Sequence, residues 1–357
     1  MNRSKIEWCD HTFNPITGCR HDCEYCYARK MTARFAGDVR LNKSAKADYR
    51  MVEAADGGDP VYVLDKPMLN ETGKPLVYPF NFEPTYHSYR FERLDALKMG
   101  NNIFVGAMAD VFGEWVPDYW IEEILAECAK RSMHNYMFLT KNPGRLVKMA
   151  NEGKLPSGDN FWYGSSVTNP GKPYFYGISR KYHSFISIEP ILADFGGYGG
   201  LGYPEWIIIG AETGNRKGKV IPDAGWIRNI VEIADRNNIP VFMKDSLIRI
   251  VGEDEMRRDY PPELRHKAIS EKMDRKLYGY CEACKAKKKK RDMVGLMAKT
   301  KRGLGAAHYC YLCRECFGKH CDRLGLNAAD ILATADGIGE KEEKQNEKKL
   351  QKDSRRE

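Results

Sequence analysis

The stretch Gly18-Cys19-Arg20-His21-Asp22-Cys23-Glu24-Tyr25-Cys26-Tyr27 places three cysteines in the spacing C-x3-C-x2-C. Iron–sulfur clusters are held by cysteine thiolates, and three thiolates this close together can cover one face of a [4Fe–4S] cluster. Three ligands for four irons leave one iron open to a small molecule, whereas an electron-carrying cluster normally has four cysteines. The spacing therefore predicts a catalytic cluster bound by Cys19, Cys23 and Cys26. The alternative is a zinc site completed by Cys9 or His21, but zinc sites usually pair two C-x2-C knuckles.

On both sides of this motif, short apolar runs alternate with helical patterns. The runs are apolar on both faces, as expected of parallel strands that helices cover. Repeated strand–helix units predict an α/β fold whose parallel sheet closes partly or completely into a (β/α) barrel. The expected strands are residues 12–17, 102–108, 136–140, 161–167, 184–189, 206–211 and 240–244, and the expected helices include 24–35, 117–131 and 223–237.

The cysteine motif, GCRHDCEYCYARK, is similar to that of the radical S-adenosylmethionine (SAM) superfamily, including the aromatic Tyr25 before the third cysteine. The chain more closely resembles a phage and prophage radical-SAM family with a domain of unknown function, near the spore-photoproduct-lyase-like branch. This resemblance covers roughly residues 4–247. It differs in a long insertion after the cluster helix and in a cysteine-rich extension, and it supplies no substrate. The segments that carry it are SKIEW, FNP, GAMADVFGEWVP, FLTKNPGRL, SIEP, WIIIGAETGN and VFMKDS.

The resemblance implies a barrel of radical-SAM type in which the open iron chelates the amino and carboxylate groups of SAM. Reductive cleavage of SAM would give methionine and a 5′-deoxyadenosyl radical, which abstracts a hydrogen atom from the substrate. The cofactor carries this chemistry, and the protein orients it. A one-electron donor such as flavodoxin or ferredoxin is the implied partner, and Tyr25 would lie against the adenine of SAM.

Polar residues follow several of the expected strands, and active sites of such barrels lie at the carboxyl ends of the strands. By the resemblance, Asp110 would lie near the SAM amino group. Hydroxyl groups at the carboxyl end of the expected strand 161–167 would lie near its ribose or carboxylate, and further charged residues could contact SAM or substrate. The alternative is that some of these residues cap the helices that follow. The candidates besides Asp110 are Thr140, Lys141, Ser165, Ser166, Thr168, Glu189, Glu212 and Lys244.

A second cysteine group lies near the C-terminus, where Cys281-x2-Cys284 is followed by Cys310-x2-Cys313-x2-Cys316 and Cys321. Two C-x2-C knuckles at this separation predict a zinc-ribbon-like module with a tetrahedron of thiolates. We favour Cys281, Cys284, Cys313 and Cys316 as the zinc ligands, with the pair Cys310 and Cys313 as the second choice for the later knuckle. An auxiliary iron–sulfur cluster is the competing interpretation.

The net charge of +8 is concentrated near this module. Residues 272–302 contain twelve Lys or Arg against three Asp or Glu, an excess of nine, so the rest of the chain is close to neutral. A basic block of this kind marks a surface for polyanions or a merely solvated loop. Together with a zinc ribbon it makes nucleic acid the expected partner.

Length and composition indicate a large domain followed by a smaller one. We expect a barrel over residues 1–255 with an irregular insertion at 41–98. A helical linker at 256–276, the zinc-ribbon-like module at 277–326 and a largely disordered charged tail at 327–357 would follow. No apolar run approaches the ~20 residues of a membrane span, and the N-terminus lacks a signal-peptide pattern. We therefore expect a cytoplasmic protein, and the resemblance adds a phage or prophage origin.

Three hypotheses about function follow. In the first, a radical-SAM enzyme acts on a nucleic acid or a nucleotide derivative and the ribbon docks the substrate. In the second, the same chemistry acts on a protein or a small metabolite. In the third, the chain is a nucleic-acid-binding protein whose iron–sulfur cluster is not catalytic.

Overall fold

The computed structural model describes residues 3–97, 100–177, 181–196, 204–265, 278–289, 293–298 and 308–332. The chain divides into two compact units, Met1–Ile269 and Ser270–Glu357. Most of the expected helical linker and the charged tail from residue 333 onward lie outside the described residues. Within the described part, no helix combines the length and apolarity that a bilayer span requires.

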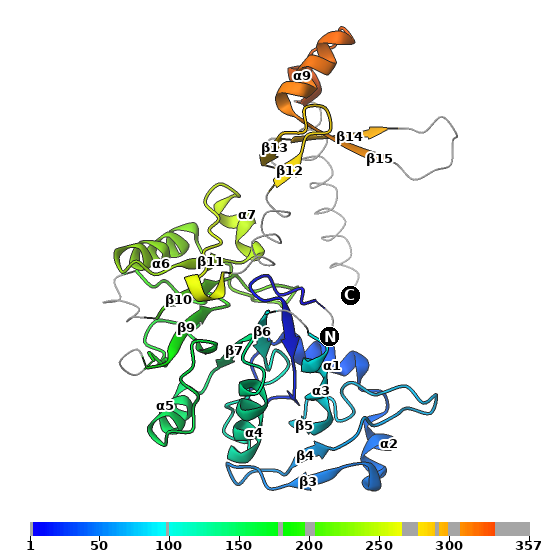
Figure 1. The fold of residues 1–357 in the computed structure, drawn as a ribbon, viewed down its shortest axis with the longest axis vertical. Coiled ribbons are helices and arrows are strands. Elements are labelled where there is room, and N and C mark those ends of the chain that lie inside the picture. The colour runs from blue at the N-terminus through cyan, green and yellow to red at the C-terminus, as the bar shows by residue number, and fades with distance from the viewer. Residues whose placement is uncertain are drawn as a thin grey trace. The chain divides into compact units, whose positions relative to one another are not determined.

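The first unit is built on a sheet of seven parallel strands (Figure 1). Neighbouring strands pair in register, for example Ile103 with Tyr136 and Ile207 with Val241. The two outermost strands, β1 and β11, do not pair with each other, so the barrel is partial. The sequence had predicted a barrel that closes either partly or completely. In spatial order the strands are β1 (His11–Phe13), β6 (Asn102–Val105), β7 (Asn135–Thr140), β8 (Phe161–Ser166), β9 (His183–Ile188), β10 (Trp206–Ile209) and β11 (Val241–Met243).

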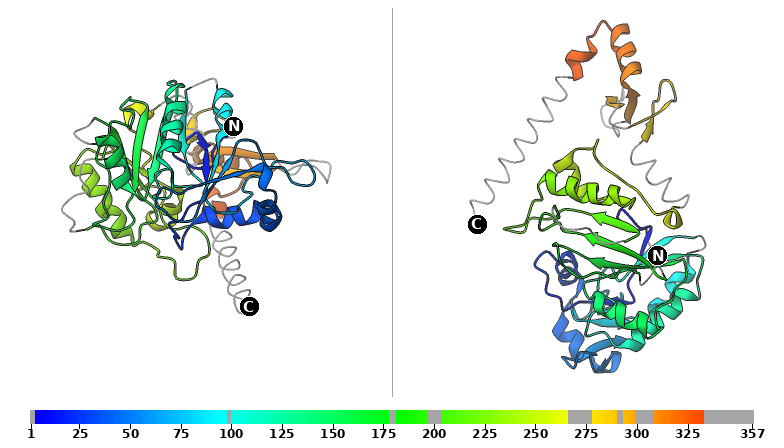
Figure 2. Two further views of the ribbon diagram at one scale, coloured as in Figure 1. Left: turned by 90° about the horizontal axis from the view of Figure 1, so that it is seen from below. Right: turned by 90° about the vertical axis from the view of Figure 1, so that its left-hand side faces the viewer.

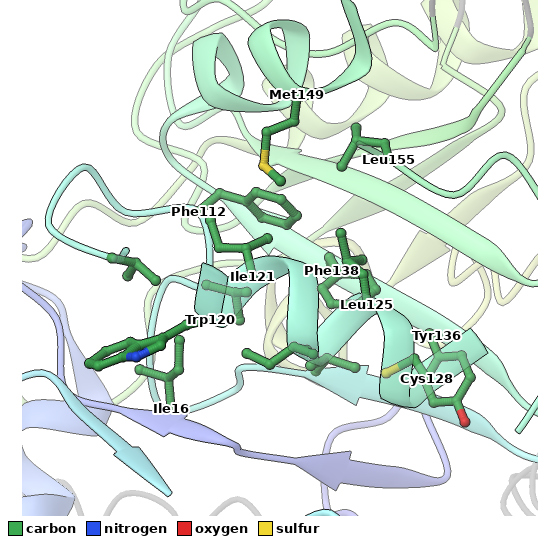
Figure 3. Packing of buried hydrophobic residues seen from close by; sticks show 14 of the residues in the cluster. Ile16, Phe112, Trp120, Ile121, Leu125, Cys128, Tyr136, Phe138, Met149 and Leu155 are labelled. Atoms are coloured by element: carbon green, nitrogen blue, oxygen red, sulfur yellow. The ribbon is translucent and has the colours of Figure 1, made fainter. Parts of the chain in front are cut away.

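Helices cover the outer face of this sheet (Figures 1 and 2). Helices α4 (Asp118–Ala129) and α5 (Pro143–Asn151) pack on β6 to β8, whereas α6 (Ala224–Arg236) packs on β9 to β11. Figure 3 shows Ile121 and Leu125 of α4 near Phe138 of β7, whereas the ring of Trp120 lies beside Ile16. Cys128 of α4 is fully buried in this core.

Aromatic side chains fill the inner face of the curved sheet. Trp8, which precedes β1, has its ring 4.7 Å from that of Phe104 and 6.1 Å from that of Trp206. Gly164 is required here, because a Cβ at this position would lie 2.3 Å from the ring of Phe185. The strands are therefore apolar on both faces because helices cover one face and these rings fill the other.

The expected strand at residues 12–17 is in fact two strands. Its first half is β1 of the barrel, and its second half, β2 (Ile16–Thr17), pairs antiparallel with β5 of another sheet. Pro15 separates the halves, and because proline has no N–H to donate it interrupts a ladder of hydrogen bonds. The chain thus changes sheets immediately before Cys19, the first cysteine of the three-cysteine motif.

The segment 41–98, expected to be irregular, contains ordered structure. With β2 it forms a four-stranded sheet in the order β2-β5-β4-β3. The central strand β4 is buried at all four positions. Short strands separated by glycines and prolines gave no clear period in the sequence. The elements are α2 (Val39–Ser44), η1 (Lys46–Asp48), β3 (Arg50–Val52), β4 (Val61–Leu64), β5 (Thr85–His87), η2 (Ser88–Arg90) and α3 (Glu92–Asp95).

Short elements complete the first unit after β11: η3 (Asp245–Leu247), α7 (Ile248–Val251) and η4 (Pro262–Leu264). The second unit contains two antiparallel pairs, β12 (Tyr278–Tyr280) with β13 (Lys287–Lys289) and β14 (Met293–Ala298) with β15 (His308–Cys313), followed by α9 (Arg314–Arg323). Its small core consists of three cysteines with Leu312 and Phe317.

Candidate functional site

The cysteine loop starts at the carboxyl edge of the barrel sheet. Gly18 forms a parallel bridge with Ala109, and its N–H donates to Met108 in the segment that follows β6. Gly18 has a φ of +86°, and a Cβ there would lie 2.3 Å from the Glu83 carbonyl oxygen. Only glycine therefore fits at this position. The next residue, Cys19, donates its N–H to the Phe82 carbonyl, which fixes the start of the loop against the inserted sheet.

The three cysteines of this loop all remain partly accessible. Cys19 and Cys26 pack against the same apolar group, which includes Phe82 and Met108. Cys26 immediately precedes helix α1 (Tyr27–Phe35), so the helix expected from residue 24 begins three residues later. Burial raises the pKa of the Cys19 thiol to about 12, and the negative charges of Asp110, Cys23 and Cys26 contribute. A bound metal cluster would reverse this effect, because a coordinating thiol is deprotonated.

Asp110 holds the cysteine loop to the barrel. Its Oδ2 accepts hydrogen bonds from His21 Nε2 at 2.7 Å, from Thr140 Oγ1 at 2.9 Å and from the Lys141 N–H at 2.8 Å. Its Oδ1 accepts the Phe112 N–H at 3.0 Å. A carboxylate has about four acceptor positions, so this buried side chain uses most of its capacity within the protein. Its expected contact with SAM stays a prediction.

Tyr25 lies beside the carboxyl end of β7. Its hydroxyl accepts a hydrogen bond of 3.0 Å from Lys141 Nζ, which also lies 5.1 Å from the centre of the Tyr25 ring. Burial by itself would lower the pKa of Lys141, but the hydrogen bond to Tyr25 and the charges of Cys23 and Asp110 raise it. Lys141 therefore places a stable positive charge close to the cysteine loop.

Glu189 and Lys244 form an ion pair at the ends of β9 and β11. Gly210, at the end of the strand between them, leaves room for the pair, because its Cβ would lie 3.2 Å from Lys244 Cδ and 3.3 Å from Glu189 Cγ. The structure thus brings together two of the residues that the sequence placed at this edge.

Glu212 is buried and forms two hydrogen bonds with Arg216, of 2.7 and 2.8 Å. The same guanidinium donates to Glu24 of the cysteine loop at 3.1 Å. The bond from Arg216 lowers the pKa of Glu212, and the charges of Lys219 and Lys30 contribute. Arg216 therefore ties the loop after β10 to the loop that carries the cysteines.

The hydroxyl residues at the end of β8 and just after it are placed less favourably for a ligand. Ser165 is fully buried and, by strand alternation, lies on the helix-covered side with Tyr163. Its Oγ accepts the Phe175 N–H at 2.9 Å, which is a structural role. Ser166 is partly exposed, and the Thr168 carbonyl accepts the Leu192 N–H. Contacts of these three residues with SAM stay predictions.

Arg216 helps to build this edge but was not among the candidates, and His21 was considered only as an alternative zinc ligand. His21 had a sequence signal, because it lies inside the cysteine motif, and Lys141 was a candidate because it directly follows a barrel strand. Arg216 gave no such signal, because its partner Glu24 lies 192 positions earlier in the chain.

The second unit gathers four of its cysteines closely. The Sγ atoms of Cys281, Cys284, Cys313 and Cys316 all lie within 4.8 Å of one another, and those of Cys284 and Cys313 are 3.9 Å apart. Zinc–sulfur bonds of ~2.3 Å place tetrahedral sulfurs about 3.8 Å apart, so the spacing suits a single metal ion. Among the described residues, this is the one group of at least three His, Cys, Asp or Glu side chains gathered so tightly.

The thiols of this group influence one another strongly. Backbone N–H groups of Cys284 and Cys313 lower the pKa of Cys281 to about 6, whereas hydrogen bonding with neighbouring thiols raises that of Cys316 to about 12. Cys321 is buried in the adjacent core and outside the group. The side chain of Cys310 lies outside the described residues, so the alternative second knuckle is not tested.

The fold and its edge define a partial (β/α) barrel with a three-cysteine loop at the carboxyl ends of its strands, followed by a four-cysteine module. The family model described as "Protein of unknown function (DUF5131)" matches residues 3–279. This match covers well over half of the chain, which therefore belongs to that family. No curated protein matches the chain.

Two solved structures of spore photoproduct lyase show weak similarity to the chain. The complex with dinucleoside spore photoproduct is 10% identical, with a TM-score of 0.32, over 86% of this chain and 69% of that chain. A cysteine-to-serine mutant of the lyase is 11% identical, with a TM-score of 0.33, over 89% of this chain and 73% of that chain.

Proposed function

We propose that this protein is a radical-SAM enzyme that acts on a nucleic acid or a nucleotide derivative. The observation that carries the proposal is the position of Cys19, Cys23 and Cys26. The three thiols lie on one loop that starts at the carboxyl edge of a parallel (β/α) sheet, where barrel enzymes bind their substrates. The donor set of three soft thiolates fits a [4Fe–4S] cluster.

When bound, the cluster and SAM would supply an electron and a 5′-deoxyadenosyl radical that takes a hydrogen atom from the substrate. The chain's own residues would fix the geometry. Asp110 orients the cysteine loop through His21. Lys141 forms a hydrogen bond with Tyr25, which would lie against the adenine of SAM, and the charge of Lys141 suits a carboxylate. Glu189, Lys244 and Glu212 would face SAM or substrate.

The second cysteine group supports a structural role for its metal. Four thiols within 4.8 Å suit Zn²⁺ better than a larger cluster, whose sulfurs stand farther apart. We propose zinc at Cys281, Cys284, Cys313 and Cys316, with an auxiliary iron–sulfur cluster as the alternative. The basic block at residues 272–302 would then bind the phosphates of the substrate. A flavodoxin or ferredoxin would deliver the electron.

The test is anaerobic reconstitution with iron and sulfide, followed by reduction and addition of SAM. We expect an EPR signal that changes when SAM binds, and 5′-deoxyadenosine as a product. Cys23→Ala should lose both, whereas Cys128→Ala, a matched change at a buried cysteine of α4, should keep them. Reconstituted protein that holds no iron would contradict the proposal. So would a cluster whose EPR spectrum does not change when SAM is added.

A further inference from the structure

Helix α1, which follows the third cysteine, presents apolar side chains to solvent. Tyr27, Met31 and Phe35 are 52%, 40% and 58% exposed, and they follow one another at intervals of four residues. Residues four apart lie on one side of a helix, so the three form a stripe. The buried residues Ala28 and Thr32 hold the neighbouring side of the helix against the protein.

This stripe begins at the edge of the candidate active site. Tyr27 directly follows Cys26, and its hydroxyl donates a 2.7 Å hydrogen bond to the Ala107 carbonyl in the segment after β6. A molecule that covers the stripe would therefore reach the cysteine loop at one end.

The side chains around the stripe are basic. Residues 27–46 contain six Lys or Arg and one acidic residue, Asp38, whose carboxylate caps α2. Lys30 and Arg34 of α1 are exposed and adjoin the stripe. No hydrogen bond or ion pair with an acidic side chain is found for either of them within the described structure.

A second basic segment lies at this edge of the sheet. The loop after β10, residues 211–223, contains Arg216, Lys217 and Lys219. The 3.1 Å bond from Arg216 to Glu24 ties this loop to the start of α1. Arg216 lowers the pKa of Glu212 of the loop, as do the charges of Lys219 and Lys30.

Exposed aromatic side chains next to a row of cations suit an unpaired nucleic-acid strand. Its bases stack on the aromatic rings, and its phosphates contact Lys and Arg. A duplex would offer only its phosphates, because its bases are already stacked. A membrane surface could also use a basic amphipathic helix, but the stripe here leads into the candidate active site, as a substrate track would.

We propose that a single-stranded segment of DNA or RNA docks along α1 and the loop at residues 211–223, with Phe35 and Tyr27 stacking bases and Lys30 and Arg34 contacting phosphates. The inference rests on the proposed function and narrows its substrate class to unpaired strands. It also places the docking surface on the barrel unit, independently of the basic block at residues 272–302.

The test measures fluorescence anisotropy of labelled strands of roughly 16 nucleotides with the full-length protein across a salt series. DNA and RNA single strands, the DNA duplex and anionic phosphatidylserine vesicles are compared. The variants are Lys30→Glu with Arg34→Glu, and Phe35→Ala. The matched control is Lys130→Glu with Arg236→Glu. These two exposed residues lie at the C-terminal ends of α4 and α6. Helices that connect parallel strands end at the amino edge of the sheet, opposite the carboxyl edge that carries the cysteine loop.

We expect single strands to bind more tightly than the duplex, and the comparison of DNA with RNA to identify the substrate. The Lys30/Arg34 variant should bind at least about ten-fold more weakly, and its salt slope should fall by about 1.4, or ~0.7 for each lost phosphate contact. Phe35→Ala should bind about five- to a hundred-fold more weakly with the salt slope unchanged.

Equal binding by the Lys30/Arg34 variant and the control would overturn the docking surface, as would binding to vesicles alone. So would a Phe35→Ala variant that binds like the wild type. The outcome is separable from the radical-SAM proposal, because binding is measured without turnover. If the variants lose binding but the wild type forms no 5′-deoxyadenosine, only the enzymatic proposal fails.

Discussion

The two cysteine groups of this protein are built in opposite ways. Cys19, Cys23 and Cys26 lie on a loop that a large barrel and an inserted sheet hold in place from outside. The four cysteines of the second unit have their Sγ atoms within 4.8 Å of one another and include two members of its small core. In the first case the fold supports the thiols, whereas in the second the thiols themselves form much of the fold.

This difference predicts what each site needs. A loop held by hydrogen bonds to a preformed edge should keep its shape without a metal. A module with so small a core lacks the buried apolar surface that stabilises larger domains, so a metal would have to supply its folding free energy. Changes at the two sites should therefore have unequal effects.

The largest effect is expected for Cys281→Ser. Loss of one of four thiolates should release the metal and unfold the second unit, because structural zinc contributes on the order of 10 kcal/mol. Elemental analysis and limited proteolysis measure this loss, and elemental analysis also separates zinc from iron. Cys321→Ser, at a buried cysteine outside the group, should retain the metal. A Cys281→Ser protein with full metal content would contradict the comparison.

A large effect is also expected for Gly18→Ala at the first site. The new Cβ would collide with backbone oxygens at 2.3 and 2.6 Å, so the cysteine loop must move. Gly73→Ala is the matched control, because Gly73 also has a positive φ of +73° but no atom within 4 Å of its Cβ. The control should lose only the ~1–2 kcal/mol of a left-handed residue. Urea denaturation and iron content after reconstitution measure the difference between the two variants. Equal losses of stability and iron in Gly18→Ala and Gly73→Ala would contradict the expected clash at Gly18.

Asp110→Asn should have an intermediate effect. An amide in place of Oδ2 would face three donors, and we expect a loss of about 2–3 kcal/mol in the free energy of unfolding, together with weaker iron retention. Asp65→Asn is the control, because Asp65 forms an exposed pair with Arg50 that is worth about 1 kcal/mol or less. Iron retention equal to that of the wild type would argue against Asp110 as the anchor of the loop.

The smallest effect is expected from protonation of His87, which makes the free energy of unfolding depend on pH. His87 is fully buried, and its Nε2 lies 2.8 Å from Thr17 Oγ1, next to Gly18. Burial lowers its pKa well below 6.5, so the unfolded chain binds this proton more readily than the folded one. Stability from neutral His87 is therefore complete above pH 6.5 and declines as pH falls, by at most ~1.4 kcal/mol per pH unit.

Urea denaturation of the wild type and of His87→Gln between pH 5 and 8 would measure this decline, which the variant should lack. His183 gives the opposite sign, because its hydrogen bond to Glu205 raises its pKa above 6.5. That contribution is complete below pH 6.5 and is lost as pH rises through the raised pKa. Identical pH profiles for the wild type and His87→Gln would refute the assignment.

Much of the fold could be predicted from sequence because its signals are local. Short runs that are apolar on both faces, such as residues 206–211, predicted the parallel strands, and the cysteine spacing predicted a compact four-thiol group. Boundaries were less accurate, since helix α1 begins at Tyr27 and Pro15 splits the expected first strand. The sheet built from segment 41–98 gave no clear pattern, because its strands are short and irregularly spaced.

The sequence by itself determined which residue types are available for metal chemistry and where the strands of the barrel run, since both are written in spacing and periodicity. Only the tertiary structure decided which partners hold those residues in place. His21 meets Asp110 across 89 positions of the chain, and Arg216 meets Glu24 across 192. Contacts between residues so far apart leave no local pattern, because they depend on how the whole chain folds back on itself.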